Sequence, residues 1–478
     1  MNPEALSQLS ARKLAAAIAR GEATSLEATQ ACLARIAALD RKLNSFMRVD
    51  AERALRTARE RDDEIARGLL RGKLHGVPLA HKDMFDRAGY VSTGGSRILA
   101  DRVATATASV LKRLDAAGAV DLGTLHMSEF AAGPTGHNVH YGPCRNAFRH
   151  DHMSGGSSSG AAAAVAARFI YGALGSDTGG SIRLPAAANG LTGVKPTYGR
   201  VSRHGALPRS WSLDHVGPLA RDARDAALIY EAIAGTDDLD STTANQPVPR
   251  GIDFDEHRRG ERLRIAFPTD DALTSVDPRV RSAIEETLRT YGDTGARIVR
   301  IALPDMQPLY ATAETIIKAE AAAMHREWLR ARPQDYAAHV RVRIEAGLAI
   351  PASQYIDALR LRPLLTRDFI AAAFGEADAL LLPAIPIPVP TIEETDAEDA
   401  DGERVLAIVG RITSFTRPIS LLGLPALTAP CGFCDRGLPI AFQLVGKPFD
   451  EERLLKTADA FQQATDFHLR HPDIARAT

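Results

Sequence analysis

The sequence predicts a single-domain α/β protein, and three observations lead to this expectation. Stretches with helical periodicity alternate with short apolar stretches along most of the 478 residues. No linker rich in proline, glycine and serine divides the chain, and no fixed-period repeat indicates a solenoid. Apolar residues make up 45% of the chain and charged residues 24%, which are ordinary values for a globular protein with a large core.

The first part of the chain, over about residues 1–70, is predicted to be a mainly helical segment. Thr24 and Glu27 have the spacing of a capping box, so a helix is expected to begin there. Residues 50–67 are rich in alanine, arginine and glutamate and predict a further helix.

The next segment, over about residues 71–235, is predicted to hold the alternating core. Residues 75–83 predict a short buried strand that ends at Lys82. Residues 106–118 predict a helix, and residues 119–125 predict the strand that follows it.

The C-terminal remainder is predicted to continue the alternation around a helical insert at about residues 306–374. Residues 378–390 begin as a strand and then carry prolines that prevent a regular ladder. The acidic stretch that follows extends this segment into a lid-like loop over residues 383–403. The other elements expected in this part are strands at 264–268, 297–303, 426–430 and 440–446 and helices at 278–291 and 450–465.

The composition argues against several classes of protein. A formal net charge of −1 provides no overall field that would attract nucleic acid or an anionic membrane, so neither is expected as a partner. The N-terminal residues lack an apolar signal segment, and no run approaches the roughly eighteen apolar residues that span a bilayer. Together with the low cysteine content, these features predict a cytoplasmic protein.

Cys431 and Cys434 form an isolated C-x-x-C pair. A zinc site would need a second pair of ligands at a suitable spacing, which the sequence lacks. The pair is therefore interpreted as part of a strand turn, and no metal or other cofactor is predicted.

Two clusters of glycine and serine stand out, at residues 154–160 and 175–185. The first reads SGGSSSG and runs into an alanine-rich stretch, and the second reads GSDTGGSIRLP. Gly175 and Gly180 have the spacing of a phosphate-binding loop, but Ser181 stands where that motif requires lysine. A nucleotide-binding function is therefore disfavoured.

The first cluster also contains a G-x-S-x-G match at residues 156–160. This is the nucleophile elbow of α/β-hydrolases, and it would make Ser158 the nucleophile of an esterase. An elbow must follow a buried strand, and residues 145–155 are largely polar and charged, which disfavours such a strand.

A third hypothesis combines both clusters with Lys82. A serine hydroxyl needs an adjacent base to act as a nucleophile at neutral pH. Lysine serves as that base where burial favours its neutral form, and Lys82 stands at the end of an apolar strand.

These residues belong to motifs that resemble the amidase signature family of hydrolases. The matching stretches are GVPLAHKD at 76–83, GGSSSGAAAAVAA at 155–167, GSDTGGSIRLPAAANGLTGVKPTYGRVS at 175–202 and GLPIAFQLVG at 437–446. The similarity runs over nearly the full chain. It implies an amidase-signature fold, in which helices cover both faces of a large mixed β-sheet, and an enzyme that cleaves amides without a cofactor.

The resemblance implies a Ser–cis-Ser–Lys triad. Lys82 takes the place of the base, Ser157 that of the bridging serine after a cis Gly156–Ser157 peptide, and Ser181 that of the nucleophile that forms an acyl-enzyme. The amides of the oxyanion hole are implied at Thr178, Gly179, Gly180 and Ser181.

Other residues are expected to support the triad or to contact the substrate. Ser158 and Ser176 are candidate hydrogen-bond partners of the triad, and Asp177 is expected to brace the backbone. Arg183 is expected to bind loop carbonyls, with a substrate carboxylate as the alternative partner. Substrate contacts are expected from Met84, Phe85, Met127, Tyr141 and Trp211.

Within the family, the central block is most similar to the glutaminase subunit of glutamyl-tRNA amidotransferase. Leu184 stands where that subunit has glutamine, and Trp211 and His215 lie in SWSLDH where it has SSLDQ. These bulkier or less polar groups favour a free-standing amidase whose substrate is a small, relatively apolar or aryl amide.

Other functions stay open at this point. One alternative is that the chain is the glutaminase subunit of a tRNA-dependent amidotransferase complex. Another is that it is an esterase of the α/β-hydrolase type that uses Ser158 as its nucleophile. A catalytically silent binding protein is disfavoured because all three triad positions are filled. Since family members are often homodimers, a homodimer is one expectation for the assembly.

Overall fold

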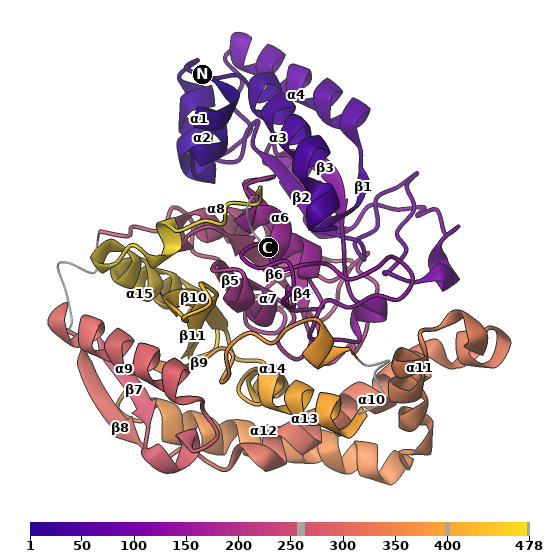
Figure 1. The fold of residues 1–478 in the computed structure, drawn as a ribbon, viewed down its shortest axis with the longest axis vertical. Helices are drawn as coiled ribbons and strands as arrows, with labels where there is room; N and C mark the ends of the chain where they lie inside the picture. Colours follow the sequence, from indigo (N-terminus) through magenta and orange to yellow (C-terminus); the bar gives the residue numbers. More distant parts are fainter. Residues whose placement is uncertain (256–262, 397–401, 476–478) are drawn as a thin grey trace.

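One mixed β-sheet of eleven strands runs through the structure, a computed structural model that describes residues 1–255, 263–396 and 402–475 (Figure 1). The strand order is β1-β3-β2-β4-β6-β5-β10-β11-β9-β7-β8. The strands are β1 (Phe46–Val49), β2 (Pro78–Lys82), β3 (Val120–Leu125), β4 (Gly172–Asp177), β5 (Thr192–Lys195), β6 (His215–Ala220), β7 (Arg264–Pro268), β8 (Arg297–Ile301), β9 (Ala379–Pro383), β10 (Ala426–Phe433) and β11 (Pro439–Gly446).

This sheet contains both parallel and antiparallel pairs, which confirms the predicted mixed α/β architecture. β2 runs parallel to both β3 and β4, and β7 runs parallel to both β8 and β9. Antiparallel pairs join these two groups through β6, β5, β10 and β11. Every residue of β9 and β11 is buried, as expected for strands in the interior of a sheet covered on both faces.

Helices surround the sheet, and the segments at its two ends are far apart in the fold. The N-terminal helices lie at one end, and the helices between β7 and β9 lie at the other (Figure 1). The helices are α1 (Pro3–Gln8), α2 (Ala11–Ala19), α3 (Ser25–Leu39), α4 (Ala51–Ala66), α5 (Ser109–Ala116), α6 (Ser159–Ala166), α7 (Arg183–Ala188), α8 (Ala223–Ile233), α9 (Pro278–Asp293), α10 (Met306–Ala331), α11 (Ala338–Glu345), α12 (Ala352–Phe374), α13 (Gly402–Thr413), α14 (Thr416–Leu422) and α15 (Glu451–Ala464).

Most elements predicted from periodicity are present at the expected places. The capping box at the start of α3 is complete: Thr24 Oγ1 accepts from the Glu27 amide at 3.0 Å, and the Glu27 carboxylate accepts from the Thr24 amide at 2.9 Å. The helical insert consists of α10, α11 and α12.

The first half of the stretch predicted as a lid-like loop is packed into the protein and does not form a lid. Ile385, Ile387 and Val389 are buried and pack in one apolar cluster with Met153 and Leu184. The prolines prevent a strand, but the apolar residues between them still bury their side chains. Residues 397–401 of the predicted loop lie outside the described residues, and its last two residues belong to α13.

A helix that spans a membrane must be both long enough and apolar enough. No single described helix meets both requirements. The bent pair α13 and α14, with 57° between the two helices, meets them together by length and composition.

The parallel pairing of β2 with β4 places the two predicted catalytic segments side by side. Ala80 pairs with Ala173 and His81 with Leu174, so both strands end at the same edge of the sheet. Lys82 is the last residue of β2, and the second glycine–serine cluster follows directly from β4.

The alanine-rich helix α6 packs closely against the neighbouring strands β2, β3 and β4. All residues from Ala161 to Ala167 are buried. At Gly160 a Cβ atom would lie 2.1 Å from the carbonyl oxygen of Ser45 and 2.5 Å from the amide nitrogen of His126. Small side chains therefore let α6 approach the neighbouring backbone, and this helix carries the serine loop at its N-terminus.

Gly160→Ala is expected to lower the free energy of unfolding by about 1–3 kcal/mol, because the added methyl group overlaps neighbouring backbone atoms. Gly292→Ala in α9 is the matched control: nothing lies within 4 Å of its Cβ position, so the free energy should stay unchanged or rise slightly. Urea denaturation measures both variants, and equal stability of the two would contradict the close fit of α6.

Candidate active site

Lys82 is a fully buried lysine whose amino group contacts two serines. Its Nζ donates to Ser157 Oγ at 2.6 Å and to Ser176 Oγ at 2.8 Å. Ser157 comes from the first glycine–serine cluster, whereas Ser176 lies in β4. The structure thus brings the predicted base and the predicted bridging serine into direct contact.

The environment of Lys82 changes its protonation. Burial lowers the pKa of the Lys82 ammonium to about 7, although the charges of Asp214 and Asp177 act in the opposite direction. A large fraction of the amine is therefore neutral near neutral pH, and a neutral amine has a lone pair that accepts a proton.

The two glycine–serine clusters meet at the site. The Gly156–Ser157 peptide is cis, as the family resemblance implies. The amide of Ser158 donates to the carbonyl oxygen of Ser181 at 3.3 Å, which joins the two loops. Ser157 is fully buried, whereas Ser181 is partly exposed and lines a cavity.

Ser158 has a supporting position and does not line this cavity. Its Oγ donates to the carbonyl oxygen of Ser176 and accepts from the amide of Ser176, both at 3.3 Å. Residues 145–158 form no strand of the sheet and make only isolated bridges. The nucleophile-elbow hypothesis is therefore wrong, because the polar residues before Ser158 provide no buried strand for an elbow to follow.

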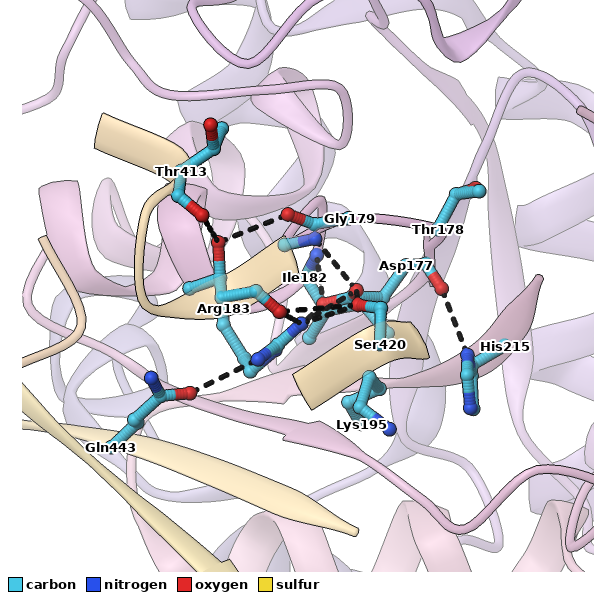
Figure 2. A network of polar contacts seen from close by, with 12 residues as sticks. Asp177, Thr178, Gly179, Ile182, Arg183, Lys195, His215, Thr413, Ser420 and Gln443 are labelled. Atoms are coloured by element: carbon cyan, nitrogen blue, oxygen red, sulfur yellow. Dashed lines mark hydrogen bonds and ion pairs between the residues drawn. The ribbon is translucent and has the colours of Figure 1, made fainter. Parts of the chain in front are cut away.

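A buried ion pair holds the loop that carries Ser181. Arg183 Nε and Nη2 each donate to a different carboxylate oxygen of Asp177 at 3.0 Å, and both side chains are fully buried (Figure 2). Asp177 also accepts from the amides of Gly180 at 2.8 Å and Ile182 at 3.2 Å. Burial alone would raise the pKa of Asp177, but Arg183 lowers it well below the usual range.

The same network ties this loop to distant parts of the chain. Arg183 donates to Gln443 Oε1 at 3.0 Å and to Ser420 Oγ at 2.7 Å (Figure 2). Gly180 has φ of +130°, and a Cβ there would lie 2.4 Å from Thr416 Oγ1. Only glycine therefore fits at this position, between the nucleophile loop and α14.

Sequence reasoning missed these distant partners. Ser420 and Thr416 carry no recognisable signal, because both lie more than 200 positions from the loop that they contact. Gln443 does carry one: it is the only polar side chain in the otherwise apolar stretch PIAFQLVG of β11. A polar residue in a strand buried on both faces predicts a buried partner.

A cavity of about 180 Å³ lies in front of Ser181. One side is formed by Thr178, Gly179 and Ser181. The rest is formed by residues 131–134, by Leu184 and Arg209, and by α10, α11, α13 and α14. The amide of Gly180 is engaged by Asp177. Of the implied oxyanion-hole residues, Thr178, Gly179 and Ser181 border the cavity directly.

The cavity is more strongly charged than the sequence suggested. Arg209, Lys318, Arg343 and Arg417 line it together with one acidic residue, Glu314. This differs from the expected pocket for an apolar or aryl amide. The physical reason is that α10, α11 and α14 bring all of these charged groups except Arg209 from more than 100 positions away in the sequence.

None of the five predicted substrate-contact residues lines this cavity, which corrects that expectation. The buried members, Met84, Phe85 and Met127, are at most 3% exposed and belong to the apolar core. Tyr141 is half-buried elsewhere, and Trp211 is 41% exposed at the surface. Proximity in sequence to Lys82 did not translate into proximity to the cavity.

Leu184 and His215, two of the differences from the glutaminase subunit that suggested an apolar substrate, lie in different surroundings. Leu184 does line the cavity. His215 is buried in β6, where its Nδ1 lies 3.1 Å from the carbonyl oxygen of Asp177 (Figure 2). It therefore belongs to the buried polar network, as does Lys195, whose amino group donates to the carbonyl oxygen of Leu424 at 2.5 Å.

The cysteine pair lies away from the cavity. Cys431 is buried in β10, and the amide of Cys434 donates to the carbonyl oxygen of Leu438 in the turn before β11. Among the described residues, no three His, Cys, Asp or Glu side chains gather as a metal site.

Comparison with known proteins yields related sequences and structures. A family model described as Amidase matches residues 27–455. A glutamyl-tRNA(Gln) amidotransferase subunit of Azotobacter vinelandii is 41% identical over 490 residues, which cover 98% of this chain and 99% of the relative.

Solved structures show the same similarity in three dimensions. A protein from a vestigial complex, described in connection with the evolutionary origins of an s-triazine catabolic enzyme, has a TM-score of 0.87 at 35% identity. The match covers 95% of this chain and 98% of that one. A peptide amidase in complex with the competitive inhibitor chymostatin has a TM-score of 0.83 at 33% identity and covers 95% and 97% of the two chains.

Replacing Lys82 should reveal its lowered pKa as a pH-dependent stability difference. An unfolded chain keeps this lysine protonated up to about pH 10.4, whereas the folded chain releases the proton near pH 7. Between these values the unfolded state binds more protons, so the stability of the wild type rises with pH. Lys82→Met lacks this titration, so its free energy of unfolding should exceed that of the wild type. This excess should shrink by up to about 1.4 kcal/mol per pH unit above pH 7.

Urea denaturation of both proteins at pH 6, 7, 8 and 9 measures this difference. It should be flat below pH 7, where both states of the wild type are protonated. A difference that is constant from pH 6 to 9 would contradict the lowered pKa of Lys82.

Proposed function

Because the chain belongs to the amidase family, we propose that it hydrolyses the carbon–nitrogen bond of a small linear amide. In this proposal Ser181 is the nucleophile, Ser157 the relay and Lys82 the base. The observation that carries this proposal is the buried contact of 2.6 Å between Lys82 Nζ and Ser157 Oγ, beside a loop that exposes Ser181 to a cavity.

The first step is a proton transfer through the bridging serine. Neutral Lys82 takes the proton of Ser157 while Ser157 takes that of Ser181, since a hydroxyl both donates and accepts. Ser181 Oγ then attacks the carbonyl carbon. Ser176 holds the lysine through its second hydrogen bond.

Backbone amides stabilise the negative charge that develops on the carbonyl oxygen. The proposed donors are the amides of Thr178, Gly179 and Ser181, because the Gly180 amide donates to Asp177. Each such donor contributes roughly 2.7–4 kcal/mol to the transition state. The Asp177–Arg183 pair keeps the loop in place, so the donors need no reorganisation during the reaction.

The second half of the reaction reverses these transfers. The protonated Lys82 returns a proton through Ser157 to the leaving nitrogen, and the amine departs from an acyl group bound to Ser181. A water molecule then attacks this ester with the same base, which releases the carboxylic acid and restores the hydroxyl. The charged side chains around the cavity favour a polar amide over the apolar or aryl amide that the sequence suggested.

A second candidate function is supported by the sequence comparison. A relative with 41% identity over nearly its full length is one component of an amidotransferase, so the substrate would be the side-chain amide of glutamine. The same triad would release ammonia, which another component of the complex would transfer to a tRNA-bound acceptor. This candidate requires other proteins, whereas the free-standing amidase does not.

Ser181→Ala should lower amidase activity by about 1,000-fold or more, because no other hydroxyl occupies the nucleophile position. Ser158→Ala is the matched comparison and should have a much smaller effect, since Ser158 Oγ contacts only the main chain of Ser176. Ammonia release measures the activity, and peptide mapping after treatment with a fluorophosphonate should place the label on Ser181. A label on Ser158, with activity retained in Ser181→Ala, would contradict the proposed triad.

The isolated chain should release ammonia from small linear primary amides without any other protein. Its rates with such amides and with L-glutamine are compared directly, and the protein is purified natively to detect bound partners. A strict preference for glutamine that appears only when other proteins co-purify would replace the first function with the second.

A further inference from the structure

His215 is a buried histidine at the start of β6, directly opposite the end of β4. It is 3% exposed, and it pairs with Asp177 across the two antiparallel strands. The imidazole Nδ1 lies 3.1 Å from the main-chain carbonyl oxygen of Asp177 (Figure 2). No step of the proposed reaction uses this side chain.

The contact with a carbonyl oxygen decides where the imidazole proton lies. A carbonyl oxygen only accepts hydrogen bonds, so Nδ1 carries the proton and donates. Nε2 then has a lone pair, and it is buried without a hydrogen-bond partner among the described residues. Burial holds the pKa of His215 well below its usual range, the charge of Lys195 lowers it further, and that of Asp177 acts in the opposite direction. The histidine is therefore a neutral donor of one fixed hydrogen bond.

The carbonyl that accepts this bond belongs to the same peptide group as the amide of Thr178. The group is planar and trans, so its oxygen and its N–H point in opposite directions. Thr178 borders the cavity in front of Ser181, and its amide is one of the proposed oxyanion donors. A hydrogen bond that fixes the oxygen on the side of β6 therefore also fixes the direction of the N–H on the other side.

The residue before His215 holds the same threonine by its side chain. Asp214 accepts a hydrogen bond from Thr178 Oγ1 at 2.5 Å. Asp214 is itself fixed, because its other carboxylate oxygen accepts from the amides of Arg209 at 2.8 Å and Ser210 at 2.9 Å. Two consecutive residues thus hold Thr178 through its hydroxyl and through the peptide group before it.

The imidazole ring of His215 is held by an aromatic neighbour. The ring of Tyr198 lies edge-on to it, with 5.7 Å between the ring centres and 81° between the planes. Arg203 and Arg362 lie over the ring of Tyr198, with Cζ at 4.9 and 5.7 Å from its centre. The tyrosine hydroxyl donates to the carbonyl oxygen of Trp211 at 2.8 Å. These contacts keep the donor of His215 in one orientation.

The bond from His215 also makes the Thr178 amide a stronger donor. A hydrogen bond to a peptide oxygen polarises the whole group, and the effect is greatest where water is excluded. Asp177 and Thr178 are 0% and 4% exposed. Hydrogen bonds to a charged acceptor are stronger than those to a neutral one, so the gain is larger for the oxyanion of the transition state than for the carbonyl of the bound substrate.

We propose that His215 is a positioning residue of the oxyanion hole: its Nδ1–H holds the peptide group between Asp177 and Thr178 so that the Thr178 amide points at the developing oxyanion. This inference rests on the proposed amide hydrolysis and assigns a role to a residue that does not line the cavity. Because the interaction acts on the transition state, loss of the donor should lower kcat and leave KM nearly unchanged.

The test compares two substitutions of similar shape. His215→Asn keeps a side-chain N–H close to the position of Nδ1, whereas His215→Leu has no donor. With the best substrate among acetamide, propionamide and butyramide, His215→Leu should lower kcat by about 10-fold or more and change KM by less than about 3-fold. His215→Asn should recover most of this loss. His215→Phe keeps a ring against Tyr198 without a donor and should match His215→Leu, which covers the case that His215→Leu does not fold.

A transition-state mimic gives a readout that a general loss of stability does not change. The aldehyde with the same acyl chain adds Ser181 Oγ to its carbonyl carbon; the carbonyl electron pair moves to its oxygen, and the serine proton passes through Ser157 to Lys82. In His215→Leu the inhibition constant of this aldehyde should rise by the same factor as kcat/KM falls. The acidic limb of the pH profile of kcat/KM should stay in place, because the base is unchanged. An inhibition constant equal to that of the wild type would contradict the role of His215.

His75→Leu is the matched control for loss of a buried histidine. His75 is 1% exposed, and its Nε2 lies 2.9 Å from the carbonyl oxygen of Arg61. It precedes β2, at the end of the strand away from Lys82. His75→Leu should lower the free energy of unfolding and leave kcat and KM at the wild-type values. Equal losses of kcat in His75→Leu and His215→Leu would overturn the proposal.

Labelling with a fluorophosphonate separates this inference from the proposed hydrolysis. Ser181 Oγ displaces fluoride from phosphorus while the phosphoryl oxygen gains negative charge, so His215→Leu should slow the labelling by about 10-fold and His215→Asn much less. Labelling of Ser181 without hydrolysis of any amide would overturn the proposed function, and the labelling rates would still decide the role of His215. Equal labelling rates in the wild type and His215→Leu would overturn that role while leaving amide hydrolysis in place.

Discussion

The burial of one amine determines most of the site. Lys82 ends a strand in the interior of the sheet, and its Nζ contacts two serine hydroxyls and no carboxylate among the described residues. Loss of water around the ammonium lowers the pKa of Lys82 to about 7, so a large fraction of the amine is neutral near neutral pH. The pairing of β2 with β4 holds Ser176 beside Lys82, and the fully buried alanine-rich α6 covers the strands that carry them.

A second buried charge arrangement keeps the nucleophile loop in position. Asp177 and Arg183 form a fully buried pair that binds amides of the loop on one side and Ser420 and Gln443 on the other. Such a pair contributes little net stability when its desolvation is counted, but removal of one partner leaves an uncompensated charge. Its value lies in position: it fixes the loop relative to α14 and β11, which come from the far end of the chain.

The cavity in front of Ser181 combines parts of the chain that are far apart in the sequence. The triad and its loops come from residues 82–183, whereas the charged walls come mostly from the helices between β8 and β10. Relatives of this chain include an amidotransferase component and a peptide amidase. In this chain the walls carry two arginines, Arg209 and Arg343, that hydrogen-bond to carbonyl oxygens and have no carboxylate partner among the described residues.

The sequence by itself determined the α/β class, most element positions and the identity of the family, because periodicity, caps and contiguous motifs are local properties. It also pointed to Lys82, Ser157 and Ser181, since each stands in a motif of fixed spacing. Only the tertiary structure decided what surrounds them: Ser420 and Gln443 behind the loop, Arg209 and Arg343 in the cavity, and the burial of the expected contacts Met84 and Met127 in the core. The reason is physical, because the position of a side chain next to a cavity depends on how distant helices pack, and neither composition nor local spacing contains that packing.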